Sequence, residues 1–143
     1  MTYVNDIRVI ASHDNMVAIN GVLAVDLTGQ IAADSLGVRM LGGAGGQVDF
    51  VMGAMLSKGG RSITALHSTA SGGKISRIVQ TLENGTVVSI PRTFADYVVT
   101  EFGIASLWGK SQKERALELI AIAHPNFRRE LESFLFNTFG AKA

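Results

Sequence analysis

The chain has 143 residues, of which 47% are hydrophobic and 17% charged, and its formal net charge is +1. This composition excludes a disordered chain, and the balanced charge gives no electrostatic basis for binding nucleic acid. The sequence contains no cysteine, which excludes disulfides, thiolate zinc sites and a cysteine nucleophile. The N-terminus does not resemble a signal peptide, and no apolar run reaches the roughly 18 residues of a membrane span. We therefore expect one cytoplasmic domain over residues 1–143 that does not enter a membrane.

The first half of the chain alternates between expected strands and glycine-rich turns. Residues 15–31, NMVAINGVLAVDLTGQI, are rich in β-branched and small apolar residues, and the run VLAVDL predicts a strand covered on both faces. The glycine-rich stretch LGGAGGQVDF (41–50) leads into a helix predicted over residues 47–57, which the glycines of KGGR (58–61) end. The buried face of this helix is predicted from apolar residues spaced one or two turns apart: Val48, Met52, Met55 and Leu56.

Further strands are expected in the middle of the chain. RSITALHST (61–69) alternates as a strand does, SGG (71–73) interrupts the pattern, and KISRIVQTL (74–82) alternates again. Asn84-Gly85 is a strong signal for a two-residue hairpin between KISRIVQTL and TVVSIP. DYVVTEFG (96–103) predicts one more strand that ends at a glycine.

The last forty residues have a helical pattern. Ser111 stands three residues before Glu114, the spacing of a capping box, and Pro125 occupies the expected first turn of a second helix. The apolar face of the first of these helices consists of Ala116, Leu119, Ile120 and Ala123. Strands, a helix, more strands and two terminal helices predict a three-layer α/β fold, with a mixed or mainly parallel sheet and helices on both faces.

Three interpretations compete for the glycine loop at residues 42–46. The first is a tight turn from strand to helix without a ligand. The second is a dinucleotide fingerprint, which fails because the third position falls on Val48 instead of glycine or alanine, and a phosphate-binding P-loop fails because no Gly-Lys-Ser/Thr follows. The third is an oxyanion hole, in which main-chain N–H groups at the start of a helix converge on developing negative charge in acyl transfer.

An oxyanion hole requires a nucleophile, and the residues alone leave its identity open. The histidines show no metal-ligand spacing, so no metal site is expected, and a structural role is favoured for each of them: His13, His67 and His124. Three carboxylates lie in otherwise apolar stretches and are expected to be hydrogen-bonded or functional: Asp26, Asp49 and Glu101. Glu101 is the candidate nucleophile, because a carboxylate can attack a thioester to form an anhydride, and the alternative is a structural acid that pairs with arginine or caps a loop.

Several motifs in order resemble the C-terminal portion of the acetyl-CoA hydrolase/transferase family, the class I coenzyme A transferases. The resemblance covers about residues 3–135 and rests on these stretches: AINGVLAVDLTGQI, GGAGGQVDFVMGA, SKGGRSITALHSTASGGKISRIV, DYVVTEFGIASLWGKS and ERALELIAIAHPNFR. The resemblance implies an acyl-CoA substrate, a small carboxylate partner, coenzyme A as substrate with no permanently bound cofactor, and a homo-oligomer. It also implies a glutamate nucleophile that passes through an acyl-glutamyl anhydride and a glutamyl-CoA thioester.

The resemblance assigns roles to individual residues of this chain. It places an oxyanion-binding N–H at Gly45, with Gly43 and Gly46 as shaping neighbours, and it places Asn5 and Lys74 in the CoA and substrate site. It aligns Glu101 with a segment other than the one that holds the family's nucleophile, which precedes the region matched here. We therefore expect a C-terminal piece of a CoA-transferase or acyl-CoA hydrolase that needs a missing N-terminal half or partner subunit.

Two features keep other interpretations open. The sequence has His67 and Gln80 where the family pattern has prolines that shape loops around the CoA site, which affects the expected substrate geometry. The alternative function is a stand-alone, non-catalytic module that binds CoA or another anion, or that docks on a partner protein.

Overall fold

The computed structural model describes residues 3–43 and 45–140. A 3-10 turn (η1, Tyr3–Asn5) precedes a short helix, and a second 3-10 turn (η2, Arg92–Phe94) lies in the middle of the chain. The helices are α1 (Ile7–Ala11), α2 (Gln47–Leu56), α3 (Gln112–Ile122) and α4 (Pro125–Phe139). The strands are β1 (Val17–Gly21), β2 (Ala24–Asp26), β3 (Ile31–Ala32), β4 (Ser35–Leu36), β5 (Arg39–Met40), β6 (Arg61–Ala65), β7 (Thr69–Ala70), β8 (Ile75–Ser76), β9 (Ile78–Val79), β10 (Tyr97–Thr100) and β11 (Gly103–Ser106).

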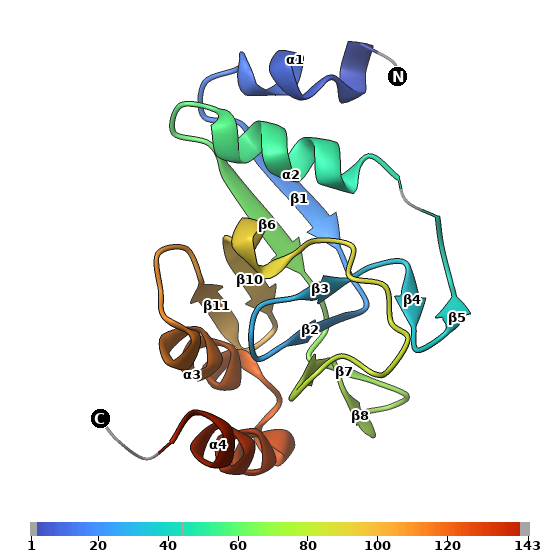
Figure 1. The fold of residues 1–143 in the computed structure, drawn as a ribbon, viewed down its shortest axis with the longest axis vertical. Helices are drawn as coiled ribbons and strands as arrows, with labels where there is room; N and C mark the ends of the chain where they lie inside the picture. The colour runs from blue at the N-terminus through green and yellow to red at the C-terminus, as the bar shows by residue number, and fades with distance from the viewer. Residues whose placement is uncertain (1–2, 44, 141–143) are drawn as a thin grey trace.

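The main sheet has four strands in the order β1-β6-β10-β11. β1, β6 and β10 run parallel, with Ile19 opposite Ile63 and Ile63 opposite Tyr97, while β11 returns antiparallel to β10 through a tight hairpin at Glu101 and Phe102. The carboxyl ends of the three parallel strands therefore meet at one edge of the sheet (Figure 1).

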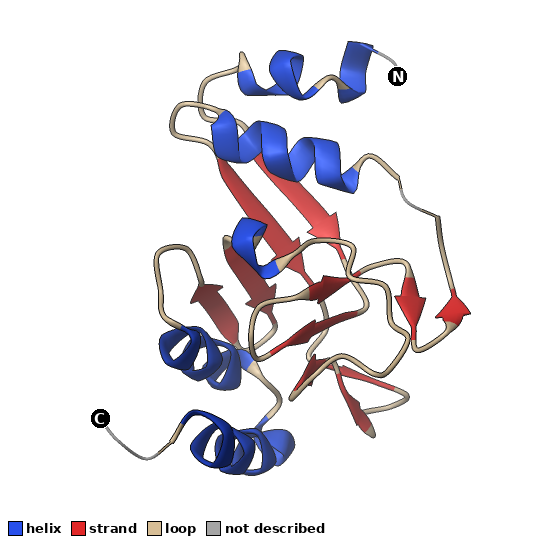
Figure 2. Ribbon diagram, in the orientation of Figure 1, coloured by secondary structure: helices blue, strands red, loops and turns tan. Residues whose placement is uncertain are grey.

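A smaller mixed sheet, in the order β3-β2-β9, packs beside the main sheet. All three residues of β2 are buried, which confirms the expectation that the VLAVDL run forms a strand covered on both faces. Two short ribbons, β4-β5 and β7-β8, complete the strands. The strands lie between α1 and α2 at one end and α3 and α4 at the other (Figure 2), so the expected α/β class, with mixed sheets and helices on both sides, is confirmed.

The extent of α2 agrees with the prediction, but its buried face differs. Val48 and Leu56 are 41% and 69% exposed, whereas Val51 and Ala54 are buried at 2% and 0%. α2 contacts β1 and β6 on one side and α1 on another, and a Cβ on Gly53 would collide with Ile10 of α1. Small residues such as Gly53 let α2 approach α1 closely. The side of α2 that packs against α1 and the strands is therefore buried, and it differs from the predicted apolar side.

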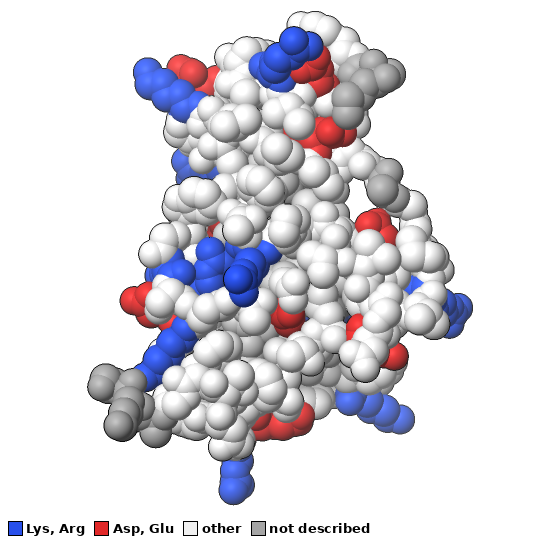
Figure 3. Space-filling model, in the orientation of Figure 1, with Lys and Arg blue, Asp and Glu red and all other residues white. Residues whose placement is uncertain are grey.

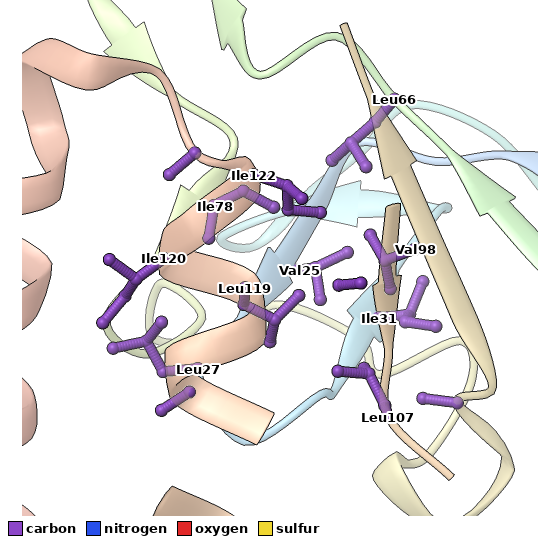
Figure 4. Close-up of a cluster of buried hydrophobic side chains, with 14 of the residues drawn as sticks. Val25, Leu27, Ile31, Leu66, Ile78, Val98, Leu107, Leu119, Ile120 and Ile122 are labelled. Atoms are coloured by element: carbon purple, nitrogen blue, oxygen red, sulfur yellow. The ribbon is translucent and has the colours of Figure 1, made fainter. Parts of the chain in front are cut away.

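The terminal helices match the prediction closely. Ser111 and Glu114 form the predicted capping box, and Pro125 is the first residue of α4. The predicted face of α3 is buried: Ala116, Leu119, Ile120 and Ala123. Figure 4 shows Leu119 pointing toward Val25, with Val98 of β10 beyond it, so α3 closes the core against the strands.

Three local expectations in the middle of the chain were wrong. The predicted strand over 74–82 is divided into β8 and β9, because β8 pairs with β7 whereas β9 pairs with β2. The Asn84-Gly85 turn forms, but residues 86–89 make no strand, and only Ile90 bridges to Ile31. The segment 96–103 contains a strand and the start of a hairpin, so β11 was not foreseen.

Charged side chains of both signs are scattered among broad uncharged areas on the face shown in Figure 3. No helix in the described part of the chain is both long and apolar enough to cross a membrane.

Candidate functional site

The candidate site lies at the carboxyl edge of the parallel strands. β1, β6 and β10 end there at Gly21, Ala65 and Thr100. α2 begins near the end of β1 in Figure 1, and Asn20 of β1 lines the same cavity as Phe50 from the first turn of α2. In open α/β sheets ligands bind outside the carboxyl ends of parallel strands, and three predicted residues, Gly45, Gly46 and Glu101, lie at or beside this edge.

The glycine loop is open to solvent and leads directly into the N-terminus of α2. Gly42, Gly43 and Gly45 are exposed, and a Cβ on any of them would meet no heavy atom within 4 Å. Gly46 is the N-cap, with φ −80°, and no side chain caps the helix there. The first N–H groups of α2 therefore face the loop without a side-chain acceptor, and they carry the positive potential of a helix N-terminus. Ala44 lies outside the described residues.

The structure brings Asn5 and Gly46 together, although 41 positions separate them in sequence. A Cβ on Gly46 would collide with the Asn5 side-chain amide and would come within 3.6 Å of the Phe50 ring. Glycine at this position thus allows Asn5 to lie against the main chain at the start of α2. The resemblance placed both residues in the substrate site, and they are direct neighbours here.

Two buried amide groups near this helix start were not foreseen. The Asn20 Nδ2 and the Gln47 Nε2 are buried and donate to no acceptor in the described part of the chain. Gln47 is the first residue of α2, and Asn20 lies on β1 in register with Thr64 of β6. Because a buried donor without an acceptor is costly, both amides carry an energetic penalty in this arrangement of the chain.

Glu101 is held by the segment that follows β6. Its Oε2 accepts a hydrogen bond from the Ser68 N–H at 2.9 Å, and its Oε1 accepts one from the Ser68 hydroxyl at 2.7 Å. These bonds hold the pKa of the Glu101 carboxyl below its usual value, and the nearby His67 contributes in the same direction. Ser68 could not be identified from local sequence patterns, because it lies 33 positions from its partner.

Glu101 and His67 line a cavity of about 340 Å³ at the ends of β6 and β10. Its other lining residues are Ala65, Leu66, Val99 and Thr100, so its wall is largely apolar. β10 lies two strands from β1, which separates the strand axes by about 10 Å. The glycine loop and Glu101 therefore lie at opposite ends of one sheet edge.

The remaining sequence candidates lie elsewhere. Lys74 is exposed on the turn between β7 and β8, and His13 is exposed at the surface. His124 caps α4 through a bond from the Asn126 N–H and stacks edge-on against Phe102 at 5.4 Å, contacts that agree with the structural role favoured for it. In the described ranges no group of three or more histidines and carboxylates is arranged to hold a metal ion.

Two of the three carboxylates expected to be hydrogen-bonded are so. Asp26 is 1% exposed and accepts four hydrogen bonds from Thr28 and Gln30, and Glu101 accepts two from Ser68. Asp49 is half-buried in the first turn of α2, where the helix dipole stabilises a carboxylate.

The family model for the acetyl-CoA hydrolase/transferase C-terminal domain matches residues 1–134. The chain belongs to this family. It is 53% identical over 129 residues to the 4-hydroxybutyrate coenzyme A transferase of Clostridium kluyveri, covering 90% of this chain and 30% of that protein. It is 50% identical over 134 residues to the butyryl-CoA:acetate CoA-transferase of Anaerostipes caccae, covering 92% and 30%.

Solved structures of the family share the fold. RipA from Yersinia pestis superposes with a TM-score of 0.88 at 46% identity over 96% of this chain and 31% of that chain.

An acetyl-CoA hydrolase of Saccharomyces cerevisiae is 34% identical over 122 residues, covering 84% of this chain and 22% of that protein. The family thus includes both transferases and hydrolases, and the chain spans about 30% of the length of the first relatives.

Proposed function

We propose that this domain supplies the oxyanion-binding loop and part of the CoA and carboxylate site for acyl-CoA thioester chemistry. The nucleophilic glutamate would come from the polypeptide that precedes this region in the longer relatives. The observation that carries the proposal is the open glycine loop, which leads without a side-chain cap into the N-terminus of α2 at the carboxyl edge of the sheet.

In the proposed reaction the glutamate carboxylate attacks the thioester carbonyl, and the Gly45 N–H stabilises the resulting oxyanion. The C–S bond breaks to give an acyl-glutamyl anhydride and CoA thiolate. The thiolate attacks the glutamyl carbonyl of the anhydride, which releases the first carboxylate and leaves a glutamyl-CoA thioester. The acceptor carboxylate then repeats these steps in reverse, or water hydrolyses the thioester in a hydrolase.

The residues around the loop suit the other parts of such a substrate. Asn5 lies against Gly46 and can bind the thioester or carboxylate oxygen. Lys74 lies away from the loop, on the exposed turn between β7 and β8, and can contact a phosphate of coenzyme A as a point charge.

Glu101 suits a positioning role better than that of the nucleophile. Both of its oxygens accept bonds from Ser68, which lowers the electron density available for attack. By holding Ser68, Glu101 ties the end of β10 to the segment after β6 and so fixes one wall of the cavity at the sheet edge.

The test uses a hybrid enzyme in which this chain replaces the matching region of the Clostridium kluyveri relative. We expect the hybrid to transfer CoA from acetyl-CoA to 4-hydroxybutyrate and to form a covalent CoA adduct, detected by mass spectrometry and lost after borohydride treatment, on a glutamate outside this chain. Gly45→Ala keeps the main-chain N–H but adds a methyl where the thioester would lie against the loop, and displacing the thioester should lower the transfer rate about 100-fold. The melting temperature should not change, because the added methyl meets open space in the domain. Leu117→Ala, on the exposed side of α3, is the matched control.

Three results would contradict the proposal. A CoA adduct on Glu101 of the isolated chain would make Glu101 the nucleophile. An active hybrid that Gly45→Ala leaves unchanged would remove the loop from catalysis. CoA binding by a folded hybrid without any adduct would favour a non-catalytic binding module.

A further inference from the structure

The main sheet has one buried face and one largely uncovered apolar face. Residues paired across strands point to the same side, so the register defines rows of side chains. One row runs through Ile19, Ile63, Tyr97 and Ser106, and the next through Gly21, Ala65, Val99 and Ile104. We call the surface made by these two rows and by Val17, which pairs with the exposed Arg61 at the start of β6, the open sheet face.

The side chains of the open sheet face are exposed to very different extents from those on the opposite side. Val17, Ile19 and Ile104 are 43%, 68% and 67% exposed, and Ile63, Ala65, Tyr97 and Val99 are half-buried. On the opposite side the alternating residues are buried: Ala18, Ser62, Thr64, Val98, Thr100 and Ala105. An alternating strand normally puts polar residues on the solvent side, so the exposed apolar side chains of this face indicate that another surface covers it.

The edge of the sheet at β1 shows the same feature. β1 is a terminal strand of the sheet, and within the described residues its outer edge pairs with no other strand. A cavity of about 310 Å³ along it is lined by Met16, Val17, Ala18, Ile19, Asn20 and Phe50. Proteins usually protect such an edge with charges, proline or a bulge, and β1 (VAING) contains neither a charged residue nor a proline.

We propose that the open sheet face is the docking surface for the polypeptide that precedes this region in the longer relatives. This inference rests on the proposed function in one respect: both assume that the preceding polypeptide is the partner of this domain. The first relatives are about three times as long as the matched region, which forms their C-terminal part. That polypeptide would join the chain at η1 and α1, which pack on α2, and α2 in turn packs on β1. It therefore enters beside the uncovered edge and presents an apolar surface to the two rows.

The absence of cysteine from the chain allows a direct footprint of this surface. Ile19→Cys and Ile104→Cys are compared with Val38→Cys, 89% exposed on the β4–β5 turn, and Leu117→Cys, 49% exposed on α3. Each variant is made in the isolated chain and in the hybrid with the Clostridium kluyveri relative, and the rate of maleimide labelling is followed by peptide mass spectrometry. We expect labelling of Ile19→Cys and Ile104→Cys to slow at least tenfold in the hybrid, and that of the two controls to change less than twofold.

A second measurement follows stability. Ile19→Lys should leave the melting temperature of the isolated chain unchanged, because the side chain is in solvent, and should lower that of the hybrid, where the lysine would be buried. Equal effects in both proteins would overturn the proposal, as would equal labelling rates at Ile19→Cys in both.

A second copy of this chain is the competing occupant, and its signature is distinct. Labelling of Ile19→Cys in the isolated chain would then slow as protein concentration rises, with no further protection in the hybrid, and this would overturn the proposal. A soluble hybrid that shows the footprint but transfers no CoA would leave the docking surface standing and count against the proposed function. An active hybrid in which Ile19→Cys remains accessible to maleimide would support the proposed function and overturn the docking surface.

Discussion

The buried carboxylate of Asp26 should be the strongest single polar contributor to the stability of the β2–β3 turn. Its Oδ1 accepts bonds from the Thr28 N–H at 2.9 Å, the Thr28 hydroxyl at 2.7 Å and the Gln30 N–H at 3.0 Å, and its Oδ2 accepts one from the Gln30 Nε2 at 2.8 Å. Asp26 is 1% exposed and belongs to β2 in the centre of the core.

The magnitude follows from which donors can find other partners. Thr28 and Gln30 are half-buried, so their side chains can turn to water when the carboxylate is removed, whereas the two backbone N–H groups are fixed by the turn. A buried donor left unpaired costs about 1–3 kcal/mol, so Asp26→Ala should lower the free energy of unfolding by about 3 kcal/mol. Asp26→Asn keeps one oxygen for the three Oδ1 bonds, and the Gln30 amide can flip toward the new NH₂, so its cost should be about 1 kcal/mol.

Urea unfolding followed by circular dichroism and by the fluorescence of Trp108, the one tryptophan, measures both variants. At this chain length a loss of 3 kcal/mol corresponds to a fall in melting temperature of about 6–12 °C. The reasoning is refuted if Asp26→Ala loses less than about 1 kcal/mol, or if Asp26→Asn is as unstable as Asp26→Ala.

Three further predictions test the site. Gly46→Ala should lower the rate of CoA transfer by the hybrid at least tenfold, because the added methyl displaces the Asn5 amide. Combining Gly46→Ala with Asn5→Ala should lower the rate little further, since both changes act on one contact. Additive losses in this double-mutant cycle would show that the two residues act independently. Thr100→Val should cost about 1–3 kcal/mol in chemical denaturation, because the Thr100 hydroxyl donates to the Ile122 carbonyl at 2.6 Å in the core; a cost near zero would contradict this. Ser68→Ala should raise the pKa of Glu101 toward its usual 4.5 in a carbon-detected NMR titration. A lowered carboxyl pKa stabilises the folded state only where the carboxyl is ionised in the unfolded chain, which is above pH 4.5. The greater stability of the wild type over Ser68→Ala should therefore be full at neutral pH and shrink as pH falls below 4.5. An unchanged Glu101 pKa in Ser68→Ala would rule out the Ser68 hydroxyl as the main cause of the lowered pKa.

Elements controlled by neighbouring residues could be predicted from the sequence. The capping box at Ser111 and the proline at the start of α4 act within one helical turn, so their signals and their effects share the same few residues. The burial of β2 was likewise readable, because a strand covered on both faces needs a continuous apolar run and few other elements do.

Elements controlled by distant contacts could not be predicted. Asn84-Gly85 makes its local turn, with the Thr86 N–H bonded to the Glu83 carbonyl, but residues after it find their partners on β3 and β4 instead of on the preceding strand. The face of α2 depends on Ile10 of α1, which packs against Gly53. A turn signal fixes where the chain reverses, and the choice of partner strand is made by the rest of the core.

The candidate site shows the same division. The glycine loop and the carboxylate after β10 were visible as unusual residues in their local setting. Their partners were not, because Ser68 reaches Glu101 across 33 positions and Asn5 reaches Gly46 across 41, and neither serine nor asparagine is rare in a surface loop. Parallel strands bring such residues to one edge, and only the strand order shows which of them meet.

The glycines of the chain divide into those that this domain explains and those that it does not. Gly53 and Gly60 lie where a Cβ would collide with Ile10 and with the Ala54 carbonyl, so packing within the domain requires them. Gly42 and Gly43 have no positive φ, and a side chain there would meet open space. Glycine weakens an ordered segment relative to alanine, so two glycines without an internal cause point to something that approaches from outside. An acyl-CoA pressed against the main chain at the start of α2 would be such a cause, and the Gly45→Ala hybrid tests it two residues further along the loop.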